Sequence, residues 1–165
     1  AEWLRTGAVL AAVTGTARPA TGCNSQPLGA MRYVAAASPA FVAQHFAGGM
    51  GAGRLAHAPS LLFNNKDELQ ARWVRRVCHR HVELPRHMLP SSQAFVTAAL
   101  AGMGWGMLPD SLAAPHLVSG ALIELVPGAP LDVPLHWQTA RAASRLLDDL
   151  SRQVVAAARS VLLPL

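Results

Sequence analysis

Cysteine and charge are both scarce in this sequence. Two cysteines, Cys23 and Cys78, among 165 residues are too few for a disulfide framework and fit a reducing compartment. Charged residues make up 14% of the chain and hydrophobic residues 52%. A disordered chain would have more charge and fewer hydrophobic residues, so global disorder is excluded. A chain of this length can bury a sizeable core.

A long hydrophobic run is also missing. Residues 88–109 carry no charge, but they include two prolines and three glycines and so do not form a continuous apolar span. No basic segment precedes an apolar run near the start, so we expect no signal peptide. We therefore expect a cytoplasmic protein without membrane contact.

The chemistry of common enzymes is not found either. Residues 48–54 are glycine-rich but lack the Lys-Ser/Thr ending of a phosphate loop, and residues 102–106 lie between a helix and a strand rather than the reverse. Cys78 and three nearby histidines lack zinc-ligand spacing, and no Gly-x-Ser-x-Gly elbow occurs. We expect no enzyme activity, no cofactor and no metal.

The positive charge is spread out. Lysine and arginine number 14 against 9 acidic residues, for a net charge of +5. Excess arginine can indicate nucleic-acid binding, but here only Arg72, Arg75, Arg76 and Arg80 form a modest cluster. We interpret most arginines as solvated faces of alanine-rich helices.

Short apolar runs and amphipathic segments alternate along the chain. The expected strands are 8–14, 31–37, 60–63, 86–89, 105–108, 122–126 and 135–139, and the expected helices are 39–46, 67–77, 92–101, 111–118 and 141–163. Residues 15–29 are expected to form a loop, and 127–134 a crossover between lobes. Such alternation indicates an α/β protein with mostly parallel sheets.

The first expected strand suggests that the chain is part of a longer protein. Residues 8–14 form an apolar run between Gly7 and Gly15, typical of a strand buried on both faces. A strand of that kind needs parallel neighbours, and no strand pattern precedes it. We therefore expect an N-terminal portion to be missing from this sequence.

Polar residues follow two of the expected strands. Ser91 and Ser92 begin a helix, where one serine can serve simply as the N-cap or both hydroxyls can help the helix amides to bind a carboxylate; the sequence favours neither. Asn64, Asn65 and Asp67 follow another strand, and Asp67 can cap a helix or hold a ligand cation. In an open parallel sheet both strand ends face one crevice.

The order of several segments resembles a known family. Ser91–Val96, then 102–109, then Ser119–Leu125 followed by Leu135–Trp137, resemble the effector-binding domain of LysR-type transcriptional regulators. Residues 28–33 ahead of 37–39 further resemble the ArgP/LysG branch of that family.

This resemblance implies a fold and a domain plan. The family has an N-terminal helix-turn-helix followed by two α/β lobes of periplasmic-binding-protein type. Residues 1–29 would end the first pass through lobe one, residues 30–122 would form lobe two, and residues 123–165 would return to lobe one with a C-terminal helix. The helix-turn-helix and the first half of lobe one would be absent from this chain.

The resemblance also implies a function. The effectors of this branch are lysine and arginine, and its targets include genes for amino-acid export or metabolism. Ser91, Ser92, Asn64 and Asn65 would lie at the lobe-two side of the effector site. From the residues themselves, we expect Asp67, or an acidic residue in the missing half of lobe one, to hold the cation of the effector.

Thr14 would lie at the lobe-one side. The protein would be a homo-oligomer that contacts DNA only through the missing domain. A periplasmic-type amino-acid-binding protein is the alternative, because it would use the same crevice after export.

Overall fold

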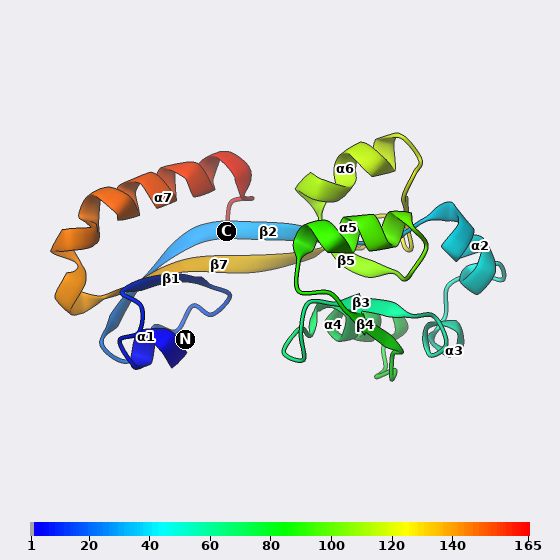
Figure 1. Ribbon diagram of the computed structural model, residues 1–165, viewed down its shortest axis with the longest axis horizontal. Helices are drawn as coiled ribbons and strands as arrows, with labels where there is room; N and C mark the ends of the chain where they lie inside the picture. Colours follow the sequence, from blue (N-terminus) through cyan, green and yellow to red (C-terminus); the bar gives the residue numbers. More distant parts are fainter. Residues whose placement is uncertain (1) are drawn as a thin grey trace. The chain divides into compact units, whose positions relative to one another are not determined.

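The computed structural model describes residues 2–165, which form two compact units (Figure 1). The first unit contains the residues up to Arg32 together with Asp132–Leu165, and the second contains Tyr33–Leu131. The chain passes between the units twice, once within strand β2 (Cys23–Ala37) and once at the start of strand β7 (Leu131–Ala140).

The first unit is a small sheet with a long helix. Its remaining elements are α1 (Glu2–Arg5), β1 (Ala11–Thr14), two 3-10 turns (Arg141–Ala143 and Arg145–Leu147) and α7 (Asp148–Val161). β1 pairs antiparallel with β7, and β7 lies next to β2. Leu28, Trp137, Val155 and Ala158 form its buried cluster. The Trp137 indole donates a hydrogen bond to Ser151 Oγ at 2.9 Å, which fastens α7 to the sheet.

Three expectations for the first unit are wrong. The strand at 11–14 is not buried on both faces, since Val13 is 51% exposed. Residues 23–29 belong to β2 rather than to a loop, because they continue the sheet beside β7. The helix expected from residue 141 begins only at Asp148, after the two 3-10 turns.

The second unit alternates helices and strands. Its elements are α2 (Pro39–Phe46), α3 (Ala52–Leu55), β3 (Ser60–Leu62), α4 (Leu69–Cys78), β4 (Arg86–Met88), α5 (Ser92–Leu100), β5 (Gly106–Pro109), α6 (Asp110–Val118) and β6 (Ile123–Glu124). Local signals set several of their ends. Ser38 Oγ accepts a hydrogen bond from Phe41 N at the start of α2, and Gly102, with φ of +73°, ends α5.

The α/β class is confirmed, but the expectation of mostly parallel sheets is wrong for the described strand pairs. β3 and β4, which are joined through helix α4, are parallel. β2 is antiparallel to both β5 and β6, and β1 is antiparallel to β7. The helical crossover between β3 and β4 makes the second strand run in the same direction as the first. Strand β2 has no such crossover, because it comes from the first unit, and it runs antiparallel to β5 and β6.

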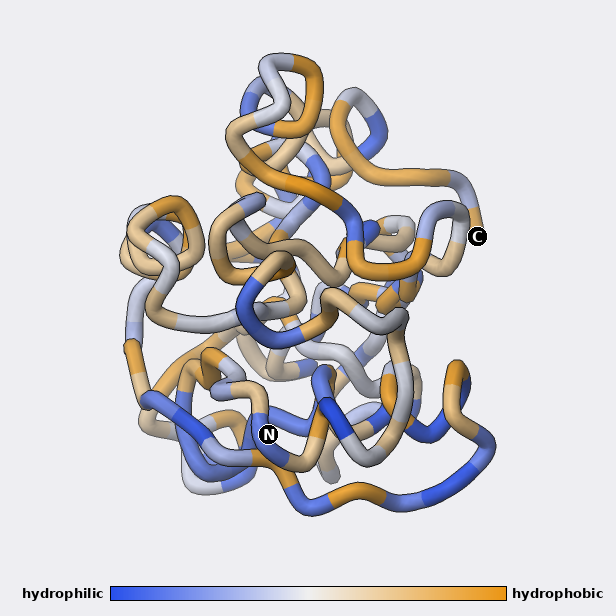
Figure 2. The backbone as a smooth tube through the Cα atoms, turned by 90° about the vertical axis from the view of Figure 1, so that its right-hand side faces the viewer, coloured by the Kyte–Doolittle hydropathy of each residue, from blue (hydrophilic) through white to orange (hydrophobic). Residues whose placement is uncertain are grey.

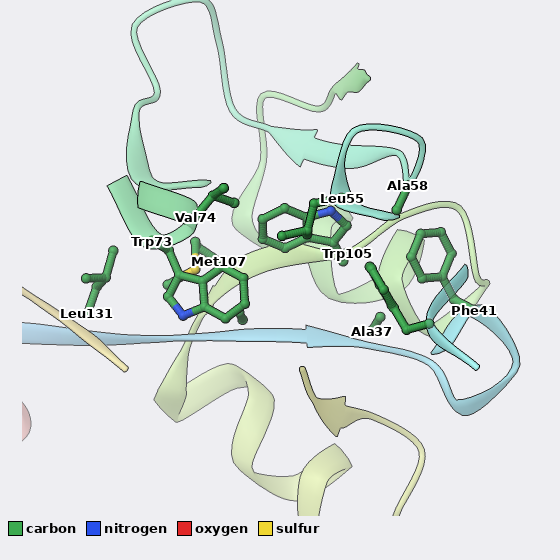
Figure 3. Close-up of a cluster of buried hydrophobic side chains, with 11 residues drawn as sticks. Ala37, Phe41, Leu55, Ala58, Trp73, Val74, Trp105, Met107 and Leu131 are labelled. Atoms are coloured by element: carbon green, nitrogen blue, oxygen red, sulfur yellow. The ribbon is translucent and has the colours of Figure 1, made fainter. Parts of the chain in front are cut away.

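Strand β2 divides the core of the second unit into two clusters. Ala35 and Ala37 face one side, where they pack in a cluster with Trp73, Trp105 and Met107 (Figure 3). The two indole rings lie 5.3 Å apart at an interplanar angle of 48°. The Trp73 indole also donates to Ala129 O at 2.8 Å, so this buried ring has its polar group satisfied.

The other side of β2 presents Val34 and Ala36 to a second cluster that includes Phe95 and Leu108. The alternation of faces over residues 33–37 of β2 matches a strand segment covered on both sides. Hydrophobic and hydrophilic stretches are interspersed along the described backbone (Figure 2). Within residues 2–165 the search for a helix long and apolar enough to cross a bilayer found none.

Candidate ligand-binding site

The parallel pairing of β3 and β4 brings two loops to one edge of the second unit. Leu62 is opposite Met88 in the register, and Leu89 N donates to Leu62 O at 2.8 Å. The chain therefore leaves both strands at the same end. Residues 63–68 follow β3, and residues 89–91 lead into helix α5, so both segments border the same region.

The beginning of α5 uses its two serines differently. Ser91 is the N-cap, and its Oγ accepts a hydrogen bond from Ala94 N at 3.3 Å. Ser92 is the first residue of the helix, is exposed, and makes no side-chain hydrogen bond within the described part of the chain. The hydroxyl of Ser92 is thus free for a ligand, next to the amides at the start of a nine-residue helix.

The loop after β3 is held by two of its own side chains. Asp67 accepts hydrogen bonds from Phe63 N at 2.9 Å and from Leu69 N at 3.1 Å. Asn64 Oδ1 accepts from Lys66 N at 2.8 Å, which closes an Asx turn. Asp67 therefore closes the loop after β3 and binds the first amide of α4, whose N-cap position is Glu68.

A cavity of about 380 Å³ lies between these segments. Its walls come from the start of β2's second-unit portion, the loop after β3, the beginnings of α4 and α5, and β5. The lining residues are Tyr33, Phe63, Asn64, Lys66, Asp67, Leu69, Ser92, Phe95, Met107 and Pro109. The volume is within the range of small-molecule sites.

Tyr33 connects the polar and apolar parts of this cavity. Burial raises the pKa of its phenol above the ordinary value of 10.0, and the negative charge of Asp67 raises that pKa further. The phenol consequently stays protonated at neutral pH and can donate a hydrogen bond. On the same face of β2 its ring packs against the cluster of Trp73, Trp105 and Met107.

These groups suit a ligand with a polar group at each end and a hydrocarbon middle. The Ser92 hydroxyl and the α5 amides are donors for an anionic group. The Asp67 carboxylate is a negative charge for a cationic group, and Lys66 is the positive charge in the same lining. Phe63, Leu69, Phe95 and Met107 supply the apolar surface between them.

The residues proposed from the sequence have different positions. Ser92, Asn64 and Asp67 line the cavity. Ser91 adjoins it as the helix cap, and Asn65 lines a neighbouring cavity instead.

Thr14 belongs to the first unit, at the end of β1. Its Oγ1 donates to Thr16 O at 3.1 Å and accepts from Gln138 Nε2 at 3.2 Å, which are contacts of a loop-holding residue.

Sequence reasoning missed several lining residues, above all Tyr33. It is the single tyrosine of the chain and precedes the small residues Val34–Ala37 on a strand, which would have been a usable signal. Lys66 is the single lysine, directly between Asn65 and Asp67. The apolar lining of Phe95 and Met107 had no signal, because buried residues of this kind occur throughout the core.

The family model described as "LysR substrate binding domain" matches residues 1–162. The HTH-type transcriptional regulator LysG of Mycobacterium tuberculosis is 42% identical over 158 residues, which cover 96% of this chain and 52% of that protein. The chain therefore spans about half the length of the curated relatives it matches.

Two solved structures are closely similar. The C-terminal domains of a LysR family protein from Agrobacterium tumefaciens superpose with a TM-score of 0.96 at 53% identity, covering 99% of this chain and 79% of that one. Full-length LysG from Corynebacterium glutamicum with bound effector Arg gives a TM-score of 0.82 at 39% identity, covering 99% of this chain and 55% of that one.

Proposed function

Because this chain belongs to the family of LysR substrate-binding domains, we propose that it is the effector-sensing part of a DNA-binding transcriptional regulator. The relatives that support this proposal are named as transcriptional regulators, and none of the named relatives is an enzyme or an exported binding protein. The proposal assigns ligand binding rather than catalysis to the cavity beside Ser92, and places the protein with chromosomal DNA in the cytoplasm.

The proposed effector is a basic amino acid, lysine or arginine. The observation that carries this choice is the cavity of about 380 Å³ with a helix N-terminus on one wall and Asp67 on another. The relative from Corynebacterium glutamicum, 39% identical across almost this whole chain, was solved with Arg bound as its effector. Both the geometry and the relative support a ligand that carries a carboxylate and a cation.

In this proposal each end of the effector has its own partner. The α-carboxylate accepts hydrogen bonds from the Ser92 hydroxyl and from the first free amides of α5, with Ser91 holding the helix start in place. The side-chain cation lies toward Asp67, and the methylene groups lie along Phe63 and Phe95. Asn64 orients polar groups from the loop after β3, whereas Asn65, also expected at this site from the sequence, lines the neighbouring cavity.

We propose that the two compact units correspond to the two lobes of the family's domain plan, so that Thr14 belongs to lobe one and the cavity beside Ser92 belongs to lobe two. The regulator as a whole would act as a homo-oligomer and would contact DNA through a helix-turn-helix outside this chain. Its target genes would concern amino-acid export or metabolism, which is the role implied by the resemblance to the ArgP/LysG branch.

The proposal is tested by calorimetry of this chain with arginine, lysine and citrulline. Citrulline has nearly the shape of arginine but no side-chain cation, so we expect it to bind much more weakly. Equal affinity for arginine and citrulline would contradict the role of Asp67 and the choice of a basic effector.

Ser92 variants test the carboxylate end. Ser92→Ala removes one donor but leaves the amides, so we expect a partial loss, on the order of tenfold. Ser92→Asp places a negative charge against the carboxylate and should abolish binding. Ser111→Asp, at an exposed position near the start of α6, is the matched control and should bind normally. Unchanged affinity in Ser92→Asp would show that the serines are only part of a helix start.

A further inference from the structure

A second, smaller cavity also borders Asp67. Its volume is about 230 Å³, and it is formed by the start of α4 and the segment 81–86 that leads into β4. Gln70, Glu68, Glu83 and Arg86 are among its lining residues. The site proposed above does not use these four residues.

Gln70 is the unusual member of this lining. Its side chain is almost completely buried, with 1% of the residue exposed. Its Nε2 donates to Leu61 O at 2.6 Å and lies 3.5 Å from Asp67 Oδ2. Both of these partners are acceptors. Exchanging the positions of Nε2 and Oε1 would therefore point the amide oxygen at two other oxygens, so the assignment of the two atoms is fixed.

The amide oxygen of Gln70 is left without a donor. No described residue donates a hydrogen bond to Gln70 Oε1, although that atom is buried. A buried acceptor without a partner is costly, and native structures usually supply one. Because Gln70 lines the second cavity, a ligand that occupies the cavity and carries an N–H group can supply the missing donor.

The charges around the cavity favour a positive ligand. Glu68 and Glu83 are exposed carboxylates, and the salt bridges found within residues 2–165 involve neither of them. Asp67 adds a third carboxylate, already engaged with two backbone amides. Arg86 is the opposing positive charge, and His81 is the remaining titratable group of the lining. Acidic groups therefore outnumber cations.

We propose that this second cavity binds a small organic cation, an ammonium or a guanidinium, through an N–H donated to Gln70 Oε1. Glu68 and Glu83 balance its charge from the rim. The site goes beyond the proposed effector site, and its only shared residue is Asp67. Binding in the second cavity can therefore succeed or fail independently of arginine binding beside Ser92.

The direct test is NMR spectroscopy of the ¹⁵N-labelled chain, following the side-chain NH₂ signals of Gln70 and Asn65. The probes are methylammonium, methylguanidinium and tetramethylammonium chlorides. The first two carry both charge and N–H donors, whereas tetramethylammonium carries the charge alone. We expect saturable shifts of the Gln70 signals with the first two probes and at least a fivefold weaker response to tetramethylammonium.

Three outcomes would overturn the proposal. Equal responses to all three probes would mean that charge alone attracts them. Shifts confined to the backbone amide signals of Tyr33 and Ser92 in the same spectra would place the cation in the larger cavity. An absence of saturable shifts at Gln70 would mean that no small cation uses this site.

Charge variants provide an independent test, because removing a carboxylate and removing the arginine should change the affinity in opposite directions. Glu68→Gln and Glu83→Gln should each weaken methylammonium binding roughly two- to fivefold, as expected for the loss of an exposed charge partner. Arg86→Gln should leave binding as tight or make it tighter, because it removes the opposing charge. Glu2→Gln, at an exposed position of α1 in the first unit, is the matched control and should have no effect. Weaker binding in Arg86→Gln would indicate an anionic or zwitterionic ligand and contradict the proposal.

Discussion

Two loops that follow strands in this molecule are held in place by different means. The loop after β3 is closed by its own residues, since Asp67 and Asn64 accept hydrogen bonds from amides no more than four positions away. The loop after β1 is closed by Gln138, which is more than a hundred positions away in the sequence.

Gln138 is fully buried and uses both ends of its amide. Its Nε2 donates to Thr14 Oγ1 at 3.2 Å, to Thr16 O at 2.9 Å and to Arg18 O at 3.1 Å, and its Oε1 accepts from Ala20 N at 3.0 Å. The loop after β3 therefore has its shape encoded in its own residues, whereas the loop after β1 takes its shape only when the rest of the first unit is folded.

The largest expected effect comes from Gln138→Ala. It removes every one of these contacts, leaves partly buried backbone groups without their partner and empties a fully buried position, so we expect the free energy of unfolding to fall by about 3 kcal/mol. Amide hydrogen exchange at Ala20 should accelerate, because its acceptor is lost. Gln44→Ala, at an exposed position of α2, is the control and should change stability by less than about 0.5 kcal/mol. A loss no greater than the control's would show that Gln138 does not hold the loop.

A smaller effect is expected from Asp67→Ala. It removes the carboxylate that accepts hydrogen bonds from Phe63 N and Leu69 N, and should cost about 1–2 kcal/mol in urea unfolding. Amide exchange should accelerate at Phe63 and Leu69, whose acceptor is lost, while Ala20 keeps its protection. Faster exchange at Ala20 as well would show that the loop after β1 also depends on Asp67, which contradicts the independence of the two loops.

The smallest expected effect is on the titration of Tyr33. Asp67→Asn removes the nearby negative charge, so the pKa of the phenol should fall toward, but not reach, its ordinary value, because burial still raises it. Ultraviolet titration can measure this directly, since the chain has one tyrosine. An unchanged titration would remove Asp67 from the surroundings of the phenol.

The same pKa shift has a consequence for stability. The folded-state pKa of Tyr33 lies above the unfolded one, so its contribution to stability is fully present below about pH 10 and is lost as the pH rises through the folded pKa. Asp67→Asn should narrow the pH range over which this loss occurs.

Sequence reasoning succeeded best where signals are local. The helix at 39–46 was expected with its cap at Ser38, and the structure has the same bounds and cap. The helices expected at 92–101 and 111–118 were also found, with ends shifted by one residue. It failed for β2 and for the C-terminal helix, where residues 23–29 and 141–147 have conformations that their own composition did not indicate.

The candidate site shows the same division. Ser92, Asn64 and Asp67 line the cavity because each follows a strand whose end could be read from the sequence. Tyr33 enters it from β2, whose direction against β5 could not be read, since pairing direction depends on where a distant strand arrives.

The sequence by itself determined the helix starts and stops, the strand ends that border the cavity, and the family resemblance. Caps and turns act within about four residues, so their signals lie in the segment they shape. Only the tertiary structure decided that β2 runs antiparallel to β5, that Tyr33 lies near the charge of Asp67, and that Gln138 holds the loop after Thr14. Those contacts join residues far apart in the chain, and they form only once the strands between them have been placed.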